Sequence, residues 1–192
     1  MEKTILKDRI ILIDADHADA VAADLRSNFK RMLGREIPAV DMASWLVCCA
    51  LDAAWKTEQG EVQVVFVHSA ACRKLSHFLP ANLEKEVDGQ AFRDDKLGEF
   101  LLSAVTEEDI NAGKPLFVQC VQALVEDKKK RSVVLVPDMA RYGDLLDEQL
   151  AADRQFEVTL LSMQPHSANG VNHVLTGFGL MHAMGIRPEE FD

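Results

Sequence analysis

The sequence Arg9-Ile-Ile-Leu-Ile-Asp-Ala-Asp16 decides how the rest of the chain is interpreted. Four consecutive aliphatic residues run into two acids that stand two positions apart. A short β-branched run of this kind, followed at once by helical periodicity, is typical of a central parallel strand that is buried on both faces. We therefore expect a strand that ends at Asp14, on the edge where open α/β sheets bind their ligands.

A second run of the same kind, Val133-Val-Leu-Val-Pro-Asp138, places another acid at the end of another strand. If the two strands are neighbours, the carboxylates of Asp14 and Asp138 face each other. Two carboxylates that lie close together repel, and a divalent cation between them removes the repulsion. The two runs together predict a site for Mg²⁺ or Mn²⁺.

The composition is that of an ordinary globular protein. The chain has 192 residues, of which 48% are hydrophobic and 27% charged, so we expect one α/β domain over residues 1–192. A net charge of −10 disfavours a protein that coats itself with nucleic acid, although it does not exclude a local basic groove. The first eight residues contain no apolar signal segment, and no run approaches the roughly 20 apolar residues of a membrane helix. The cysteines lack CxxC spacing, which favours reduced thiols in the cytoplasm.

Strands and helices are expected to alternate along the chain. Strands are expected over residues 9–14, 62–68, 132–136 and 157–161, and the run 100–105 could be a strand or a helix. Helices are expected directly after Asp16, after Ser69 and from near Thr106. Three further helices are expected over residues 39–55, 142–153 and 169–184. Residues 87–95 have the composition of a loop. Strands separated by helices predict a parallel sheet with both faces covered. The expected fold is a Rossmann-like three-layer sandwich with a mainly parallel five-stranded sheet in the order 3-2-1-4-5.

The helix expected over residues 39–55 has almost no polar face between Asp41 and Asp52. A helix of this kind is either buried on all sides or offers one side to a partner. Simple burial and a homodimer interface both remain open for this helix.

In its succession of elements the chain resembles the PIN-like nucleases, including their NYN branch. The resemblance rests on the strand ending at Asp14, two helices before the second strand, an acid near the start of the helix before strand four, and Asp138. Glu107, Glu108 and Asp109 are candidates for the helix-start acid, with Asp109 best placed. The family's acids hold Mg²⁺ or Mn²⁺ ions that activate water for attack on an RNA phosphodiester. The segment Val136-Pro-Asp-Met-Ala-Arg-Tyr-Gly-Asp144 looks like a stretched form of the NYN segment.

The chain also resembles the haloacid dehalogenase phosphatases. The pair Asp14 and Asp16 is similar to their nucleophile and acid/base residues, Ser69 stands where that family keeps a hydroxyl, and Lys114 stands where it keeps a lysine. Asp138 and Asp144 could be its metal-binding acids. The departures are His17-Ala18 after Asp16, where the family has Gly-Thr, and the lack of room for its small hairpin. This resemblance implies a small phosphorylated substrate and covalent attack by Asp14.

Each of these residues also has a structural interpretation. Asp16, Ser69 and Thr106 with Asp109 could simply cap helices, and Asp138 could begin a turn. The departures from both motifs also leave room for a catalytically inactive scaffold that acts through protein association.

The sequence therefore gives three hypotheses: a PIN/NYN-like ribonuclease, a small-molecule phosphatase, and a non-catalytic scaffold. The candidate residues are, for catalysis, Asp14, Asp16, Asp138 and Asp109; for metal, Asp14, Asp138 and Asp144; and for substrate, Ser69, Lys114, Arg141 and Tyr142. For the ribonuclease, the cations expected to contact the RNA backbone are Arg26, Lys30, Arg31 and Arg35.

Overall fold

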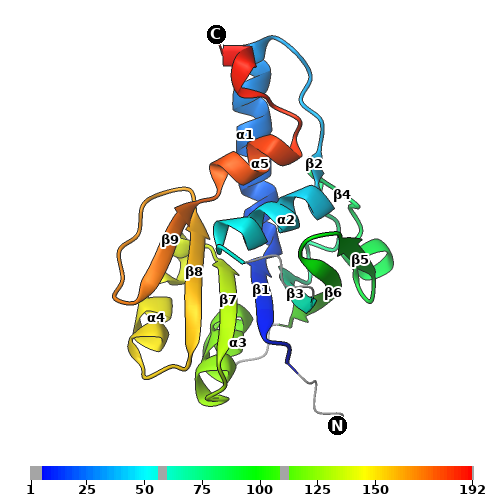
Figure 1. The fold of residues 1–192 in the computed structure, drawn as a ribbon. Coiled ribbons are helices and arrows are strands. Elements are labelled where there is room, and N and C mark those ends of the chain that lie inside the picture. The colour runs from blue at the N-terminus through cyan, green and yellow to red at the C-terminus, as the bar shows by residue number, and fades with distance from the viewer. Residues whose placement is uncertain (1–5, 56–59, 109–112, 192) are drawn as a thin grey trace.

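The computed structural model of the protein describes residues 6–55, 60–108 and 113–191, and its centre is a seven-stranded sheet in the order β5-β6-β3-β1-β7-β8-β9 (Figure 1). Its strands are β1 (Arg9–Asp14), β3 (Gly60–Ser69), β5 (Ala91–Asp94), β6 (Gly98–Glu107), β7 (Arg131–Val136), β8 (Phe156–Ser162) and β9 (Val171–Leu175). Only β5 is antiparallel to its neighbour. A separate two-stranded sheet pairs β2 (Val40–Asp41) with β4 (Phe78–Leu79).

Helices cover both faces of the sheet. They are α1 (Ala15–Leu33), α2 (Met42–Asp52), α3 (Leu116–Glu126), α4 (Met139–Ala151) and α5 (Gly177–Ala183), with a π-helical turn over Leu83–Val87 and a 3₁₀ turn over Pro188–Phe191. Successive side chains of β1 point to opposite faces, as the pleat requires. Ile11 and Ile13 pack in the core that contains α1, α2 and α5, whereas Ile10 and Leu12 pack in the core that contains α3 and α4. The α/β three-layer arrangement expected from the continuous aliphatic run is confirmed.

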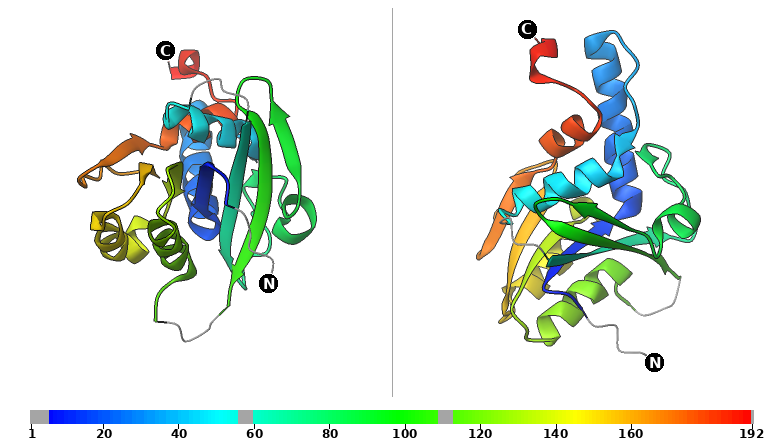
Figure 2. Two further views of the ribbon diagram at one scale, coloured as in Figure 1. Left: turned by 60° about the horizontal axis from the view of Figure 1, so that its bottom comes forward. Right: turned by 45° about the vertical axis from the view of Figure 1, so that its right-hand side comes forward.

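Helix α1 extends past the rest of the fold, and the C-terminal turn lies beside its far end (Figures 1 and 2). Phe29 packs edge-on against Phe191, with ring centroids 5.9 Å apart. The guanidinium of Arg35 pairs with Glu190 at 2.7 Å, and this contact together with a backbone hydrogen bond lowers the pKa of Glu190 to about 2. None of the described helices is both long and apolar enough to cross a membrane.

The strand count and the complete strand order differ from the expectation. The sheet has seven strands rather than five, because β5 and β9 are added at its two edges. Residues 100–105, whose state was open, belong to strand β6, and part of the expected loop 87–95 forms β5. Between the two added strands the five expected strands keep the relative order 3-2-1-4-5.

The helix expected after Ser69 is wrong. Strand β3 continues to Ser69, which is paired with Glu107 of β6. The segment that follows is held as a loop by acids of α1, because Asp19 accepts hydrogen bonds from the backbone N–H groups of Ser76 and His77. These bonds come from distant residues, so local periodicity could not predict them.

The expected helix boundaries at Thr106 and Asn169 are also wrong. Thr106 lies within strand β6, and the next helix begins only at Leu116. Most of residues 171–175 would fit a helical face, but they pair in parallel with β8 as strand β9 and so extend the sheet. The helix expected over 142–153 is α4, which begins three residues earlier at Met139.

Candidate functional site

Asp14 lies at the carboxyl end of β1 and begins helix α1. Its Oδ1 accepts the backbone N–H of His17 at 2.9 Å, so it is the N-cap of the helix. Its Oδ2 accepts the hydroxyl of Tyr142, which comes from the neighbouring helix α4. Only 5% of Asp14 is exposed. Each oxygen of this buried carboxylate therefore already has one neutral hydrogen-bond donor.

Tyr142 reaches Asp14 because helix α4 is irregular at this residue. Its backbone has φ −145° and ψ 24°, which interrupts the helix after the first turn. The ring stacks on Phe117 of α3 with 5.3 Å between centroids. Burial, followed by the charge of Asp14, raises the pKa of Tyr142, so the phenol stays protonated and acts as a hydrogen-bond donor.

Asp16, in the first turn of α1, holds the end of β3. It accepts the backbone N–H of Ser69 at 2.8 Å and the Ser69 hydroxyl at 2.6 Å. Cys72 lies beside this pair, and its backbone N–H donates to the Ser69 hydroxyl at 3.2 Å. Burial, together with the nearby carboxylates, raises the pKa of the Cys72 thiol to about 11. The expected capping role of Ser69 is wrong, because no helix follows it.

Asp138 begins helix α4 in the same way that Asp14 begins helix α1. Its Oδ1 accepts the N–H groups of Ala140 at 3.0 Å and Arg141 at 3.1 Å, so it is the N-cap of α4. The ring of His17 lies nearby, with 3.8 Å between its Nδ1 and the same oxygen. Because β1 and β7 are adjacent and parallel, the two capped helices begin side by side.

Glu107 lies at the end of β6 and accepts hydrogen bonds from two donors. It accepts the N–H of Leu116 at 2.8 Å, at the start of α3, and it pairs with the guanidinium of Arg141 at 2.9 Å. We call Asp14, Asp16, Glu107 and Asp138 the acidic edge. In the part of the chain that the structure describes, Asp14, Asp16 and Asp138 form no ion pair with a lysine or arginine.

A hollow of about 380 Å³ opens beside Asp138, between α4 and the segment after β8. It is lined by acids of α4, including Asp144 and Asp147, and by His17, Ser162 and His166. His166 pairs with Asp147 at 2.8 Å. Since Pro165 and His166 follow β8 without any recognisable motif, the His166 pair could not be found from spacing alone. We call this space the outer hollow.

A smaller recess lies on the α2 and α5 side and shares His17 and Ser162 with the outer hollow. Two buried polar atoms line it, the indole Nε1 of Trp45 and the hydroxyl of Thr176. Neither atom has a hydrogen-bond partner within the described residues. Its volume of about 10 Å³ is close to the space that one water molecule needs.

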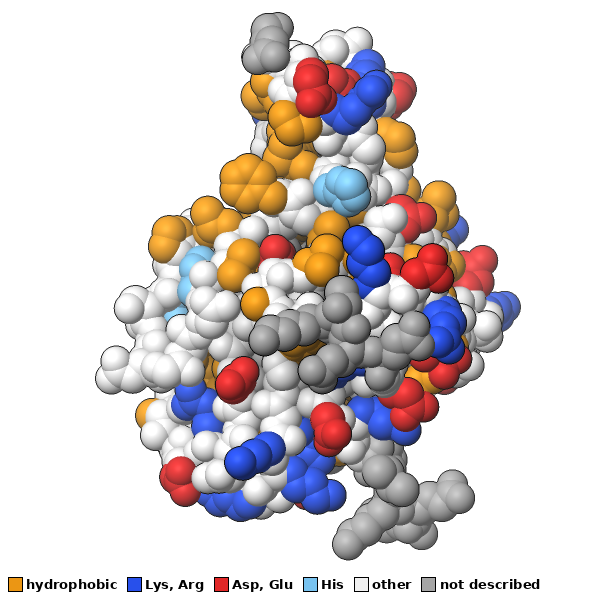
Figure 3. All heavy atoms as spheres, in the orientation of Figure 1, with side chains coloured by type: hydrophobic (Ala, Val, Ile, Leu, Met, Phe, Trp, Pro, Cys, Tyr) orange, Lys and Arg blue, Asp and Glu red, His pale blue; other side chains and the backbone are white. Residues whose placement is uncertain are grey.

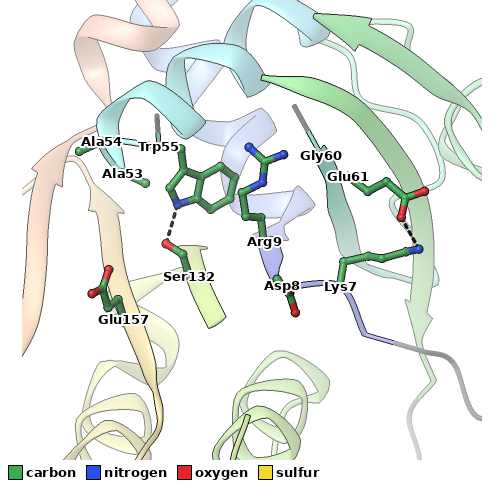
Figure 4. Close-up of a pocket in the computed structure, with 10 residues that line it drawn as sticks. All are labelled: Lys7, Asp8, Arg9, Ala53, Ala54, Trp55, Gly60, Glu61, Ser132 and Glu157. Carbon is green, nitrogen blue, oxygen red and sulfur yellow. Dashed lines mark hydrogen bonds and ion pairs between the residues drawn. The ribbon is translucent and has the colours of Figure 1, made fainter. Parts of the chain in front are cut away.

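A further hollow of about 480 Å³ lies at the opposite edge of the sheet, where the parallel strands begin (Figure 4). Figure 4 shows the ring of Trp55 between Ser132 and Arg9. Its Nε1 donates to the Ser132 hydroxyl at 2.5 Å, and the Arg9 guanidinium lies 5.7 Å from the ring centroid. Lys7 pairs with Glu61 at its rim. These polar groups bond one another, so we place the candidate site at the acidic edge instead.

A model of a protein family matches residues 3–191, and its description is "Family of unknown function (DUF6621)". The chain belongs to this family. No curated protein and no solved structure gives a significant match.

The structure brings some of the predicted site residues together and separates others. Asp14 accepts a hydrogen bond from Tyr142, Asp16 accepts two from Ser69, and Asp138 caps the helix that carries Arg141 and Tyr142. Asp144 is exposed and lines the outer hollow, and Lys114 is exposed in the segment before α3. Asp109 lies outside the described residues.

The row of cations predicted for RNA is not at this site. Arg26 donates to the carbonyl of Ile37, Lys30 and Arg35 pair with Glu36 and Glu190, and Arg31 donates to Asn28. All four belong to the second half of α1 or the turn after it, whereas the acidic edge lies at the first residues of α1. These cations therefore lie away from the acidic edge, and their contact with an RNA backbone stays a prediction.

The carboxylates of the acidic edge do not form a complete binding site for a divalent metal. Within the described residues, no three His, Cys, Asp or Glu side chains are grouped so that they could hold a metal ion by themselves. Mg²⁺, however, is commonly bound by one or two carboxylates, with water and substrate phosphate as its other ligands. Asp16 and Asp138 are partly exposed, as the carboxylates of such an open site must be.

Proposed function

We propose that the protein is a divalent-metal-dependent phosphoester hydrolase, similar in mechanism to the PIN/NYN nucleases and acting on RNA. The observation that supports this proposal is the group of Asp14, Asp16 and Asp138, whose hydrogen-bond donors are backbone N–H groups and hydroxyls. Neutral donors orient the carboxylates without cancelling their charge, so the negative field of the acidic edge attracts a cation.

Asp16 or Asp138 would hold Mg²⁺ or Mn²⁺ together with water and substrate phosphate, and the buried Asp14 would add negative charge to the acidic edge. A carboxylate has about four lone-pair sites, so the hydrogen bonds that Asp16 and Asp138 accept leave room for a ligand. Such an ion lowers the pKa of bound water and neutralises charge that develops on phosphate oxygens. Arg141 and Tyr142, at the rim and the base of the edge, would orient the phosphate and the carboxylates. A cytoplasmic location, which free cysteines fit, is part of the proposal.

The covalent mechanism of the haloacid dehalogenases is less well supported. That mechanism requires a free oxygen of Asp14 to approach phosphorus in line with the leaving group. Here both oxygens already accept hydrogen bonds, and the carboxylate is buried. A small phosphorylated substrate nevertheless stays a second candidate, because the outer hollow falls within the size range of small-molecule sites, about 300–1,000 Å³.

The test is hydrolysis in Mn²⁺ of single-stranded RNA and of a chromogenic phosphate monoester, measured side by side. Asp138→Asn is the informative variant, because asparagine caps a helix about as well as aspartate but carries no charge. We expect its rate to fall about 100-fold or more, as is typical when a group that stabilises transition-state charge is removed. Asp24→Asn, at an exposed position of α1, is the matched control and should keep full activity.

The two substrates separate the candidates. Cleavage of RNA alone supports the nuclease, and RNA binding should then weaken as salt rises. Cleavage of the monoester alone supports the small-molecule hydrolase. If wild-type protein cleaves neither substrate, the hydrolase proposal is wrong, and a role in protein association replaces it.

A further inference from the structure

One surface of this acidic protein carries few charged side chains. From residue 158 to residue 186 the chain contains no Asp, Glu, Lys or Arg, although 27% of the whole chain is charged. Helix α2 is likewise uncharged from Met42 to Leu51. Helices α2 and α5 pack against each other, so the two uncharged segments form one continuous surface. We call α2, β9 and α5 the neutral face; within these three elements Asp52, at the end of α2, is the one Asp, Glu, Lys or Arg residue.

Large apolar side chains are exposed on the neutral face. Phe178 of α5 is 74% exposed, and Leu51 of α2 is 56% exposed. Figure 3 shows hydrophobic side chains gathered over α5 and the upper end of β9. Phe178 cannot turn inward by rotating the helix, because α5 is packed tightly on α2. A Cβ atom placed on the next residue, Gly179, would lie only 3.1 Å from the Cβ of Cys48.

A groove lies on the same face, beside this phenylalanine. Its volume is about 320 Å³. Its walls include the apolar side chains of Val47 and Leu51 of α2, and β5 adds Phe92 together with the charged residues Arg93 and Asp94. His182 of α5 also lines it. Residues four apart on a helix are neighbours on its surface, so Phe178 lies directly next to the groove. A closed apolar cavity of about 150 Å³ is enough to bind benzene, so a groove of about 320 Å³ has room for a phenylalanine ring.

We propose that the neutral face is a homodimer interface in which Phe178 of each copy inserts into the groove of the other. A two-fold interface uses the same patch on both subunits, so that patch must be complementary to itself. The neutral face meets this requirement because it carries a projecting ring and a matching groove side by side. Of the two roles that the sequence leaves open for helix α2, this one is the homodimer interface. Helix α5 supplies the aromatic side chain that inserts into the partner.

The charge of the chain favours a second copy as the occupant. Two copies that each carry −10 repel wherever charged surfaces meet, and a face with few charges is where they can approach most closely. A membrane is a poor alternative, because peripheral helices that bind lipid usually carry Lys and Arg beside their apolar side chains. The neutral face has neither residue within α2, β9 or α5.

The experiment is sedimentation velocity of the full chain over a wide range of protein concentration. We expect wild-type protein to be dimeric. Phe178→Ser should raise the dimer dissociation constant by at least about 100-fold, because each of the two copies loses a buried aromatic side chain from the interface. Met32→Ser, at another exposed apolar position on α1, should leave the dimer unchanged. Circular dichroism checks that each variant is folded, which we expect because both side chains are exposed.

Mixing two defective variants tests the geometry directly. Phe178→Ser keeps its groove but lacks the ring, whereas Leu51→Lys keeps the ring but has a charge at the groove. A mixture should form heterodimers through one intact contact, although each variant alone is monomeric. A monomeric wild-type protein, a dimer that survives Phe178→Ser, or a mixture without heterodimers would each overturn the proposal. None of these outcomes depends on whether the acidic edge is catalytic.

Discussion

Replacing Tyr142 by phenylalanine removes one hydroxyl from the acidic edge and leaves the packing of the ring on Phe117 intact. The hydroxyl is the donor to Oδ2 of the buried Asp14. A hydrogen bond to a charged group contributes about 1.5–3 kcal/mol to stability. For a chain of 150–250 residues, 1 kcal/mol corresponds to about 2–4 °C in melting temperature. We therefore expect Tyr142→Phe to lower the melting temperature by about 3–12 °C.

A double-mutant cycle shows whether this loss belongs to the contact between Tyr142 and Asp14. Denaturant unfolding would be measured for Tyr142→Phe, Asp14→Asn and the double variant, because asparagine still caps α1. We expect the effects to be clearly non-additive, with an interaction energy of about 1 kcal/mol or more, as residues in contact show. If the effects add to within about 0.5 kcal/mol, the hydroxyl does not hold Asp14 in solution and the reasoning fails.

Two further predictions concern polar groups near the acidic edge. We expect one ordered water molecule in the recess, hydrogen-bonded to Trp45 and Thr176. Thr176→Val should therefore lower the melting temperature by about 1–6 °C. A higher melting temperature would show that the recess is dry. The raised pKa of Cys72, about 11 against 9.0, leaves about 100-fold less thiolate at pH 8 than an unperturbed thiol has. Iodoacetamide should therefore modify Cys72 very slowly, and more quickly in Asp16→Asn; fast labelling of the wild-type thiol at pH 8 would contradict the shift.

Short-range patterns were sufficient for the centre of the fold. The aliphatic runs before Asp14 and Asp138 identify buried strands, because residues on both sides of a parallel strand face a core. In the structure the two runs are adjacent strands, β1 and β7. The pattern also placed the acids correctly at the carboxyl edge, since strands in one parallel sheet end on the same side.

Elements whose state depends on distant partners could not be predicted in this way. The segment after Ser69 has helical spacing, yet Asp16 binds the backbone of Ser69 at its start and Asp19 binds the backbone of Ser76 and His77 within it, so it stays a loop. Residues 171–175 become a strand because β8 offers an unpaired edge to them. The bond between Tyr142 and Asp14 joins residues 128 positions apart and depends on an irregular turn in α4.

The acidic edge explains why sequence alone could not separate a helix cap from a catalytic residue. Asp14 and Asp138 are both caps, and each accepts backbone N–H groups at the start of a helix. A carboxylate that caps a helix can still bind another ligand, because the capping hydrogen bonds occupy only some of its lone pairs and do not remove its charge. The backbone N–H groups at the start of each helix instead hold the carboxylate in a fixed position. A cap and a metal ligand are therefore compatible roles for one residue. Replacing aspartate by asparagine separates them, because the substitution preserves the cap and removes the charge.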